Sequence, residues 1–447
     1  MKRVLLFLVL VCLSVPVLAA NHVVLLKKNA SLPAFAAAVA AQGGSVKWSH
    51  ADGIAAVSGL TEAAASVLAG DSRVASIVAD EAAFLDVPVA PQTAGVLLSD
   101  GVLLGDGSAT DPAAASFFPR QWHMRVVGAD TAWAAGRLGS PDVTVAILDT
   151  GIDYTHPDLA GRVDLSRSTS FVESDDALVA SLYPGRHPVT DLHWHGTHVA
   201  SNVSSNALYA AGVTSRTTLI GVKVLDRNGG GDFSDVLAGV YYAVDQGADV
   251  LNLSIQAWTT KDHSGRFISF FNRAFNYAQQ KGALVVGIAG NFALDLDHDG
   301  NGWESICSPS NVLCVSGTGP LSAADPLLGP WFDVDALAFY SNYGRSAIDV
   351  AAPGGTLAGR IWGSCATTSQ IVLFCQNSFE AVGVGGTSQA APHVAGLAAL
   401  LVEDIGKGQP SLIKNRILQN ADDLGQPGTD PAYGKGRINI PRTLGLQ

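Results

Sequence analysis

The stretch Gly385–Gly396 reads GGTSQAAPHVAG and runs into a continuous apolar segment, Leu397–Val402. Small residues before Ser388 allow close backbone packing, and the alanine-rich continuation predicts a helix that begins near this serine. Backbone N–H groups at a helix N-terminus stabilise negative charge, so a serine there is suited to act as a nucleophile. An ordinary helix cap beside a close-packed glycine would have the same pattern, so other parts of the chain must decide.

Two further stretches supply the partners that a nucleophilic serine needs. Asp149 ends the apolar run in AILDTGID (residues 146–153), and His195 lies in DLHWHGTHVA (residues 191–200). The chain order is therefore Asp, His, Ser, one of the three orders in which the orienting acid, general base and nucleophile of serine hydrolases occur. This combination favours the nucleophile over the helix cap.

With these stretches the sequence resembles the subtilisin-like serine proteases, and the matching segments run from Gln121 to Asn439. The resemblance implies that Asp149 orients and stabilises the imidazole, and that His195 takes the proton from Ser388 Oγ. It also implies that Asn291, in VGIAGN, donates its amide N–H to the developing oxyanion. We therefore expect a serine endopeptidase that works through an acyl-enzyme intermediate.

The same resemblance suggests where a substrate binds. Leu253 and Ser254 match the strand beside which the substrate backbone lies as an added strand. Residues 255–257 read IQA where small residues and glycine are usual, so the sequence does not predict a side-chain preference. One wall of the pocket for the residue before the scissile bond is expected from Gly287, Ile288, Ala289 and Gly290.

Composition limits the classes of partner. The chain has 447 residues, of which 48% are hydrophobic and 15% charged, so it can bury a large core and form more than one domain. A formal charge of −12 disfavours nucleic acid as the natural partner. We expect protein or peptide substrates, no nucleic-acid or organic-cofactor binding, and a monomer.

Residues 1–20 have the pattern of a secretory signal. Met1-Lys2-Arg3 is a basic start, Val4–Leu18 is apolar, and Ala19 and Ala20 supply the small residues of a cleavage site. No later apolar run is long enough to span a bilayer. These features predict a protein secreted to the extracellular space or the periplasm, with no membrane attachment after signal removal.

Four cysteines follow the signal. Two local disulfides, Cys307–Cys314 and Cys365–Cys375, are the simplest of the three possible pairings and fit an oxidising compartment. Metal binding by thiolates is the alternative, and the chain has no C-x-x-C pair to support it.

Residues 21–85 follow the order strand, helix, strand, strand, helix, strand, which predicts a small ferredoxin-like α+β domain. Ser31 and Thr61 are expected to cap the two helices, and Val74–Leu85 to close the sheet. By resemblance this is a propeptide that assists folding of the enzyme and inhibits it until cleaved. Residues 86–118 have the composition of a linker, within which we expect the maturation cleavage.

Residues 119–447 alternate apolar strands with helices. This pattern predicts a doubly wound, mostly parallel α/β sheet with helices on both faces and chemistry at the carboxyl ends of strands. The expected strands are Val143–Asp149, Leu219–Leu225, Asp249–Ser254, Ala283–Ala289, Val312–Ser316 and Ala347–Ala352. The expected helices are Phe233–Gln246, Phe267–Gln280, one that begins near Ser388, and Ser411–Asn420.

An aspartic protease, a zinc enzyme and a non-catalytic binding protein would each require other residues. ILDTG also occurs in aspartic proteases, but those need a second D-T-G or D-S-G, and none is present. His193, His195 and His198 form a histidine cluster, but their spacing does not bring three rings to one zinc ion, and H-E-x-x-H is absent. A non-catalytic binding protein on this fold would need a missing site residue, and none of the four is missing.

Residues 295–302 read DLDHDGNG, which alternates carboxylates and then turns at glycine, as in the first half of a calcium loop. The twelfth position is Ile306 and not glutamate, so this is no complete EF-hand, and a solvated acidic turn is the alternative. The resemblance allows a structural calcium here. Its expected ligands are Asp295, Asp297, Asp299 and Asn301.

Overall fold

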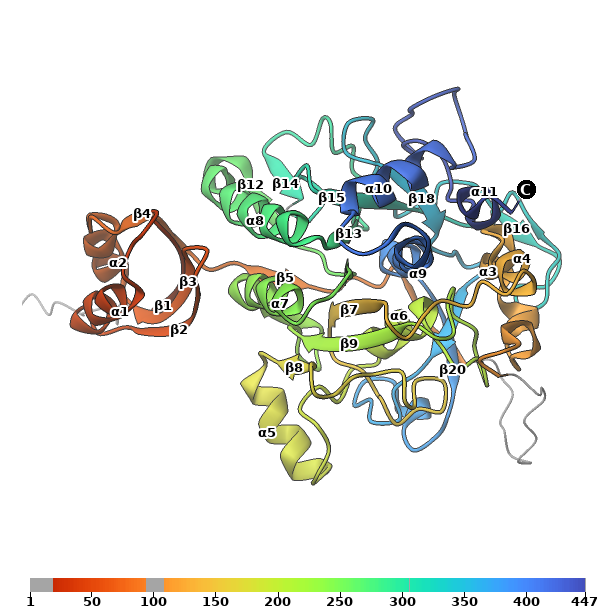
Figure 1. Ribbon diagram of the computed structural model, residues 1–447, viewed down its shortest axis with the longest axis horizontal. Helices are drawn as coiled ribbons and strands as arrows, with labels where there is room; N and C mark the ends of the chain where they lie inside the picture. Colours follow the sequence, from red (N-terminus) through yellow and green to blue (C-terminus); the bar gives the residue numbers. More distant parts are fainter. Residues whose placement is uncertain (1–18, 94–107, 305, 447) are drawn as a thin grey trace, which may run out of the picture. The chain divides into compact units, whose positions relative to one another are not determined.

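The computed structural model describes residues 19–93, 108–304 and 306–446 and divides the chain into two units, Met1–Asp80 and Glu81–Gln447 (Figure 1). Nearly all of the predicted signal, residues 1–20, lies outside the described residues, so it stays a prediction. Each unit has its own apolar core. The boundary falls five residues before the predicted one, because residues 82–84 pair with a strand of the larger unit.

The smaller unit is a four-stranded antiparallel sheet in the order β2-β3-β1-β4. Ser31 Oγ accepts the Ala34 N–H at the start of one helix, and Thr61 Oγ1 accepts the Ala64 N–H at the start of the other, so both predicted caps are confirmed. The elements are β1 (Ala20–Leu26), α1 (Leu32–Ala41), β2 (Ser45–His50), β3 (Ile54–Leu60), α2 (Glu62–Ala69) and β4 (Val74–Ala79). The predicted α+β arrangement is present, whereas its role as a propeptide is not tested by it.

The larger unit is built on a seven-stranded sheet in the order β18-β15-β13-β11-β7-β9-β8, in which every neighbouring pair is parallel. From β7 the chain adds strands first on one side and then on the other, which is the doubly wound topology predicted from the sequence. The strands are β7 (Thr144–Asp149), β8 (Thr169–Ser170), β9 (Thr218–Lys223), β11 (Val250–Leu253), β13 (Leu284–Ile288), β15 (Val312–Thr318) and β18 (Val350–Pro353).

Helices cover both faces of this sheet because successive side chains of a buried strand point to opposite sides. In β7, Val145 and Ile147 pack in one apolar cluster with α9 (Thr387–Ile405). Leu148 points the other way, where a methyl group added at Gly239 of α7 (Phe233–Asp245) would lie 3.3 Å from its side chain. The other helices are α3 (Trp122–Val126), α4 (Ala129–Ala134), α5 (Glu173–Leu182), α6 (His195–Val203), α8 (Lys261–Lys281), α10 (Pro410–Gln419) and α11 (Ile440–Leu444).

The region between the units differs from the prediction. Val74–Leu85 is not one closing strand, because β4 ends at Ala79 and β5 (Ala82–Phe84) pairs with β10 (Gly230–Asp232) of the larger unit. The predicted linker also contributes a strand, β6 (Val89–Thr93), which pairs with β20 (Ala381–Gly385). β20 in turn pairs with β19 (Ile361–Ser364). These short strands form where exposed edges offer hydrogen-bond partners, which local sequence does not reveal.

Both predicted disulfides are confirmed: Cys307 is bonded to Cys314 and Cys365 to Cys375. The Phe267–Gln280 helix was predicted too short, because α8 begins at Lys261. Among the helices of the described ranges, none combines the length and apolarity that a bilayer span requires.

Two buried histidines, His123 and His393, connect α9 to the backbone of Trp362 through hydrogen bonds. His123 Nε2 accepts the Trp362 N–H, so its Nδ1 carries the hydrogen and donates to His393 Nε2, 2.8 Å away. His393 Nδ1 then donates to the carbonyl of Gln389, one residue after Ser388. Burial lowers the pKa of His123 well below its usual range and that of His393 to about 4. Both rings are therefore neutral near neutral pH.

This arrangement predicts acid sensitivity of the fold. The unfolded chain binds a proton at His393 near pH 6.5, whereas the folded protein does so only near pH 4. Stability is therefore fully present above pH 6.5 and falls as the pH drops toward 4, by up to about 3 kcal/mol for this group. In a Ser388→Ala background, which prevents self-digestion, His393→Gln should lower the melting temperature at pH 7 but flatten its decline between pH 6.5 and 4.

The control is His298→Gln, which changes an exposed histidine and should leave the decline close to that of the parent. An equally steep decline in His393→Gln would contradict the assignment.

Candidate active site

Asp149 and His195 meet at the carboxyl end of the central strand. Asp149 is the last residue of β7 and His195 the first of α6, and both side chains are completely buried. His195 Nδ1 lies 2.9 Å from Asp149 Oδ1 and 3.0 Å from Oδ2. The carboxylate therefore holds the hydrogen on Nδ1 and leaves Nε2 as the acceptor. His195 Nε2 has no hydrogen-bond partner among the described residues.

Two glycines allow the turn after Asp149 and the turn that begins at His195 to pack closely together. A side chain on Gly151 would stand 2.3 Å from the Val189 carbonyl oxygen, and φ there is +111°. A side chain on Gly196 would stand 2.1 Å from the Gly151 carbonyl oxygen. Neither distance is possible for a real Cβ, so glycine is required at both positions. The residue before His195 is also strained, since Trp194 has φ of +138°.

A second buried carboxylate, Asp191, joins the two turns. Its Oδ1 accepts from Thr150 Oγ1 and from the N–H groups of His193 and Trp194. Its Oδ2 accepts from both the N–H and the hydroxyl of Thr197. Burial raises the pKa of the Asp191 carboxyl. Asp191 is not among the residues predicted from the sequence, because nothing local marks an acidic residue four positions before a histidine as structural.

Ser388 lies in the first turn of α9, as predicted, and is buried. Its Oγ donates to the Ser254 carbonyl oxygen at 3.2 Å. Ser254 Oγ donates to the Ser388 carbonyl oxygen at 2.8 Å, so the end of β11 and the start of α9 are bound in both directions. The hydroxyl of Ser388 is therefore directed to Ser254, and no described residue forms a hydrogen bond with His195 Nε2.

Asn291 lies just after β13 and beside the start of α9. Its Oδ1 accepts from the Thr387 N–H at 2.9 Å and from Thr387 Oγ1 at 2.8 Å. These two donors fix the amide so that Nδ2 faces away from Thr387. Nδ2 donates to the carbonyl oxygen of Asp86 at 2.8 Å. The Asn291 amide, next to the first turn of α9, thus binds a backbone carbonyl of the segment that follows β5.

The residues expected at the substrate site are spread over the ends of two strands. Leu253 and Ser254 end and follow β11, and Gln256, two residues on, pairs with Phe84 through two backbone hydrogen bonds. Gly287 and Ile288 end β13, and the Ala289 carbonyl accepts from Asn342 Nδ2. The Gly290 carbonyl accepts the Asn342 N–H, and φ at this glycine is +97°. A role of residues 287–290 as a pocket wall stays a prediction.

The two neighbouring histidines are separate from this chemistry. Burial and the adjacent His195 lower the pKa of both His193 and His198 to about 3, so both rings are neutral. His198 Nε2 donates to the Ile361 carbonyl, and its Nδ1 lies 3.4 Å from Asn202 Nδ2. Among the residues with described placement, no group of three or more His, Cys, Asp or Glu side chains could hold a metal ion.

The predicted calcium loop uses its first carboxylates for contacts within the protein. Asp295 accepts from His298 Nδ1, and Asp297 accepts from the Ser346 hydroxyl and N–H. Asp299 and Asn301 also have interactions of their own. Asp295 and Asp297 are thus engaged by other side chains, and calcium at this loop stays a prediction from the sequence.

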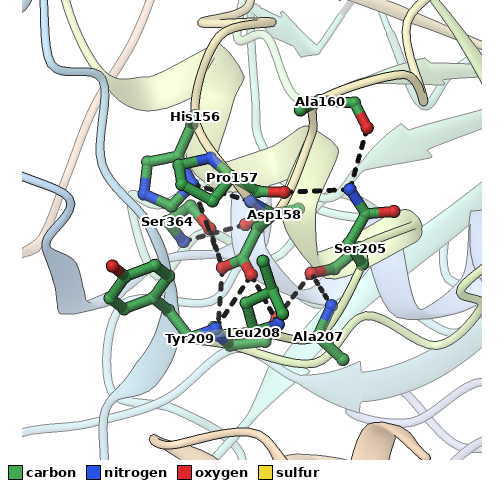
Figure 2. Close-up of polar contacts among 12 residues, drawn as sticks. His156, Pro157, Asp158, Ala160, Ser205, Ala207, Leu208, Tyr209 and Ser364 are labelled. Atoms are coloured by element: carbon green, nitrogen blue, oxygen red, sulfur yellow. Dashed lines mark hydrogen bonds and ion pairs between the residues drawn. The ribbon is translucent and has the colours of Figure 1, made fainter. Parts of the chain in front are cut away.

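Asp158 is a further carboxylate satisfied by the chain itself (Figure 2). Its Oδ1 accepts the N–H groups of Leu208 and Tyr209, and its Oδ2 accepts the Ala210 N–H and the Ser364 hydroxyl. The side chain is completely buried. Four donors compensate for the lost hydration of the charge, so no cation is needed at this position.

Comparison with known proteins agrees with this geometry. The model of the Subtilase family matches residues 140–436. A thermophilic serine proteinase of Bacillus sp. (strain AK1) is 35% identical over 316 residues, which cover 69% of this chain and 63% of that protein. Halolysin of Haloferax mediterranei is 33% identical, and the match covers 75% of this chain but 54% of the relative. The chain thus spans less than two thirds of the length of these two relatives.

One more relative and two solved structures also match the chain. Thermitase of Thermoactinomyces vulgaris is 32% identical over 331 residues, which cover 73% of this chain and 97% of that protein. The epidermin leader peptide processing serine protease of Staphylococcus aureus superposes with a TM-score of 0.72 at 20% identity, covering 96% of this chain and 98% of that one. Fervidolysin of Fervidobacterium pennivorans gives a TM-score of 0.70, also at 20% identity, with 96% and 61% covered. At this identity the structural matches support the fold.

The family model covers all four residues: Asp149 ends β7, Asn291 follows β13, and His195 and Ser388 lie in the first turns of α6 and α9. The chain therefore belongs to the subtilase family.

Proposed function

We propose that this protein is a serine endopeptidase in which Asp149, His195 and Ser388 form the catalytic triad. The observation that carries the proposal is the buried Asp149–His195 pair, whose Nε2 is left unpartnered among the described residues. A buried imidazole held by a carboxylate and free at its other nitrogen is suited to act as a general base. The named proteases among the relatives add support.

The reaction then proceeds in two halves. The Ser388 hydroxyl turns from Ser254 toward His195, loses its proton to Nε2 and attacks the scissile carbonyl carbon. Asp149 stabilises the imidazolium, which passes the proton to the leaving amine as the C–N bond breaks. Water, deprotonated by His195, hydrolyses the acyl-enzyme and restores Ser388.

The negative oxygen that forms in each half is stabilised by Asn291. Its Nδ2 donates to a peptide carbonyl at 2.8 Å, a distance suited to a donor aimed at the developing charge. The bond from Thr387 to Oδ1 keeps the amide in this orientation, so little reorganisation is needed as charge develops.

We further propose that the protein is secreted to the extracellular space or the periplasm as an inactive precursor and processes itself. The signal pattern in residues 1–20 and the two disulfides support an oxidising, exported location. The ferredoxin-like unit supports a propeptide, which would act as an intramolecular inhibitor. The active protein is expected to be a monomer.

Replacing the oxyanion donor tests the site. Asn291→Leu has similar volume but no N–H, so turnover should fall by roughly a hundredfold or more while KM changes little. The control is Thr387→Val, which removes one donor to Asn291 Oδ1 but leaves Nδ2 in place, and it should lose far less. Steady-state kinetics on a chromogenic peptide measure both. A kcat of Asn291→Leu within a few-fold of the parent would make Asn291 a structural residue.

Replacing the nucleophile tests the mechanism. Ser388→Ala removes only Oγ, so the protein should fold, stay at full length, and lose more than about a thousandfold in peptide hydrolysis. A serine-reactive phosphonate should label Ser388 in the parent, while a chelator or a pepstatin-type inhibitor should not block hydrolysis. The control Ser322→Ala changes an exposed serine and should behave as the parent. Retained hydrolysis by purified Ser388→Ala would exclude the serine mechanism.

Calcium is a separate proposal that rests on the sequence of residues 295–301. If the carboxylates rearrange to bind calcium in the folded state, the melting temperature of Ser388→Ala should rise with calcium concentration by mass action. Changing Asp295, Asp297 and Asp299 together to asparagine should abolish the rise. An unchanged rise in that variant would place the calcium elsewhere.

A further inference from the structure

One segment of the chain, Ala82–Thr93, lies in extended form along the candidate active site. Its first part is β5, which runs antiparallel to β10, with Phe84 opposite Gly230 and Ala82 opposite Asp232. Its last part is β6, which runs antiparallel to β20. Between the two strands lie Leu85–Pro88. A polypeptide bound at both ends as an added strand is held as a protease holds a substrate.

We propose that the bond cut in maturation is the peptide bond between Asp86 and Val87, and that the protein's own Ser388 cuts it. The inference rests on the proposed function and adds to it the bond and its position in the site.

The residues before this bond are fixed by backbone hydrogen bonds on both sides. The Phe84 N–H donates to the Gln256 carbonyl at 2.9 Å, and the Gln256 N–H donates to the Phe84 carbonyl at 3.0 Å. The Leu85 N–H donates to the Gly229 carbonyl at 2.8 Å. β5 therefore lies between β10 and the segment that follows Ser254. Ala83 is 1% exposed, so one side chain of this strand is buried against the protein.

The carbonyl of Asp86 is the one that Asn291 binds. Asn291 Nδ2 donates to it at 2.8 Å, while Asn291 Oδ1 is held by Thr387, the residue before Ser388. In a serine protease the donor of this kind binds the carbonyl that the nucleophile attacks. Of the carbonyls in the segment, that of Asp86 is thus the one in the position of the scissile carbonyl.

The residues after the bond occupy the other half of the site. Val87 packs against the apolar cluster of Trp194, Val382 and the Cys365–Cys375 disulfide, next to His195. A side chain on Gly386 would lie 3.4 Å from Pro88, and one on Gly385 would lie 3.0 Å from Val89. The glycines that precede Ser388 therefore leave room for this segment. Val89 is 1% exposed and pairs with Gly385, three residues before the nucleophile.

Every group that this cleavage needs, apart from water, belongs to the chain itself. Ser388 Oγ bonds to the Asp86 carbonyl carbon, and its proton passes through His195 to the nitrogen of Val87 as the Asp86–Val87 bond breaks. Water then hydrolyses the ester, which leaves a new carboxylate on Asp86 and an N-terminus at Val87. Both fragments are still bound at the site immediately after cleavage, because β5 pairs with β10 and β6 pairs with β20.

The experiment follows the first fragments of the full-length protein by mass spectrometry in H₂¹⁸O. The parent should yield a small fragment that ends at Asp86 with one heavy oxygen in its new carboxyl group, and a large one that begins at Val87. Val87→Ala keeps the N–H and should give the same pair. Val87→Pro should give no fragment that ends at Asp86, because proline lacks the N–H and restricts the residue before it.

First fragments that end elsewhere in the parent, or a Val87→Pro chain cut at residue 86 at the parental rate, would overturn the inference. Ser388→Ala separates the two proposals, since fragments that still form in that variant would refute self-processing and not the position of the bond. A peptide of residues 82–93, AAFLDVPVAPQT, covers the case in which Val87→Pro does not fold. The mature enzyme should cut it between Asp and Val, and cleavage only at other bonds would also overturn the inference.

Discussion

The geometry of the site depends on the buried carboxylate of Asp191. Its two oxygens accept from Thr150, His193, Trp194 and Thr197, and so connect the turn after Asp149 to the first turn of α6. Burying an ionised group is costly unless donors compensate for its lost hydration, and here they belong to the two turns that must meet. The strained backbone at Trp194 is held by the same contacts. Asp149 and His195 are thereby placed by the contacts of a third buried residue, Asp191.

Much of this could be predicted because the relevant patterns are local. Apolar runs separated by helical segments predicted the parallel sheet, and the motifs around Asp149, His195 and Ser388 predicted the candidate site. Asn291 was found through the resemblance. The strand at Val89–Thr93 could not be found, because two of its five residues are polar, one is proline, and its pairing depends on a strand almost 300 residues later. Asp191 was missed for the same reason, since its partners are set by the fold.

The helix that carries Ser388 is unusual in being buried along most of its length. Every residue of α9 from Thr387 to Val402 is buried, and alanine and glycine let neighbouring elements approach closely. A side chain on Gly396 would stand 2.5 Å from Val213, so bulk is not tolerated there. The histidine pair and Ser254 bind the first turns of this helix to α3 and β11. Ser388, the proposed nucleophile, is therefore held in the core, and its position depends on packing as well as on polar contacts.

The contacts of Asp158 determine whether this part of the fold depends on metal ions in solution. A loop that is stabilised by a bound metal ion depends on the concentration of that ion, and a chelator destabilises it. The loop at residues 208–210 is instead held to Asp158 by its own amides, within one covalent chain. These amides belong to the same chain as Asp158, so dilution or a chelator cannot remove them. The hold on this loop is therefore independent of the concentration of any metal ion, and it lasts as long as the chain stays folded around Asp158.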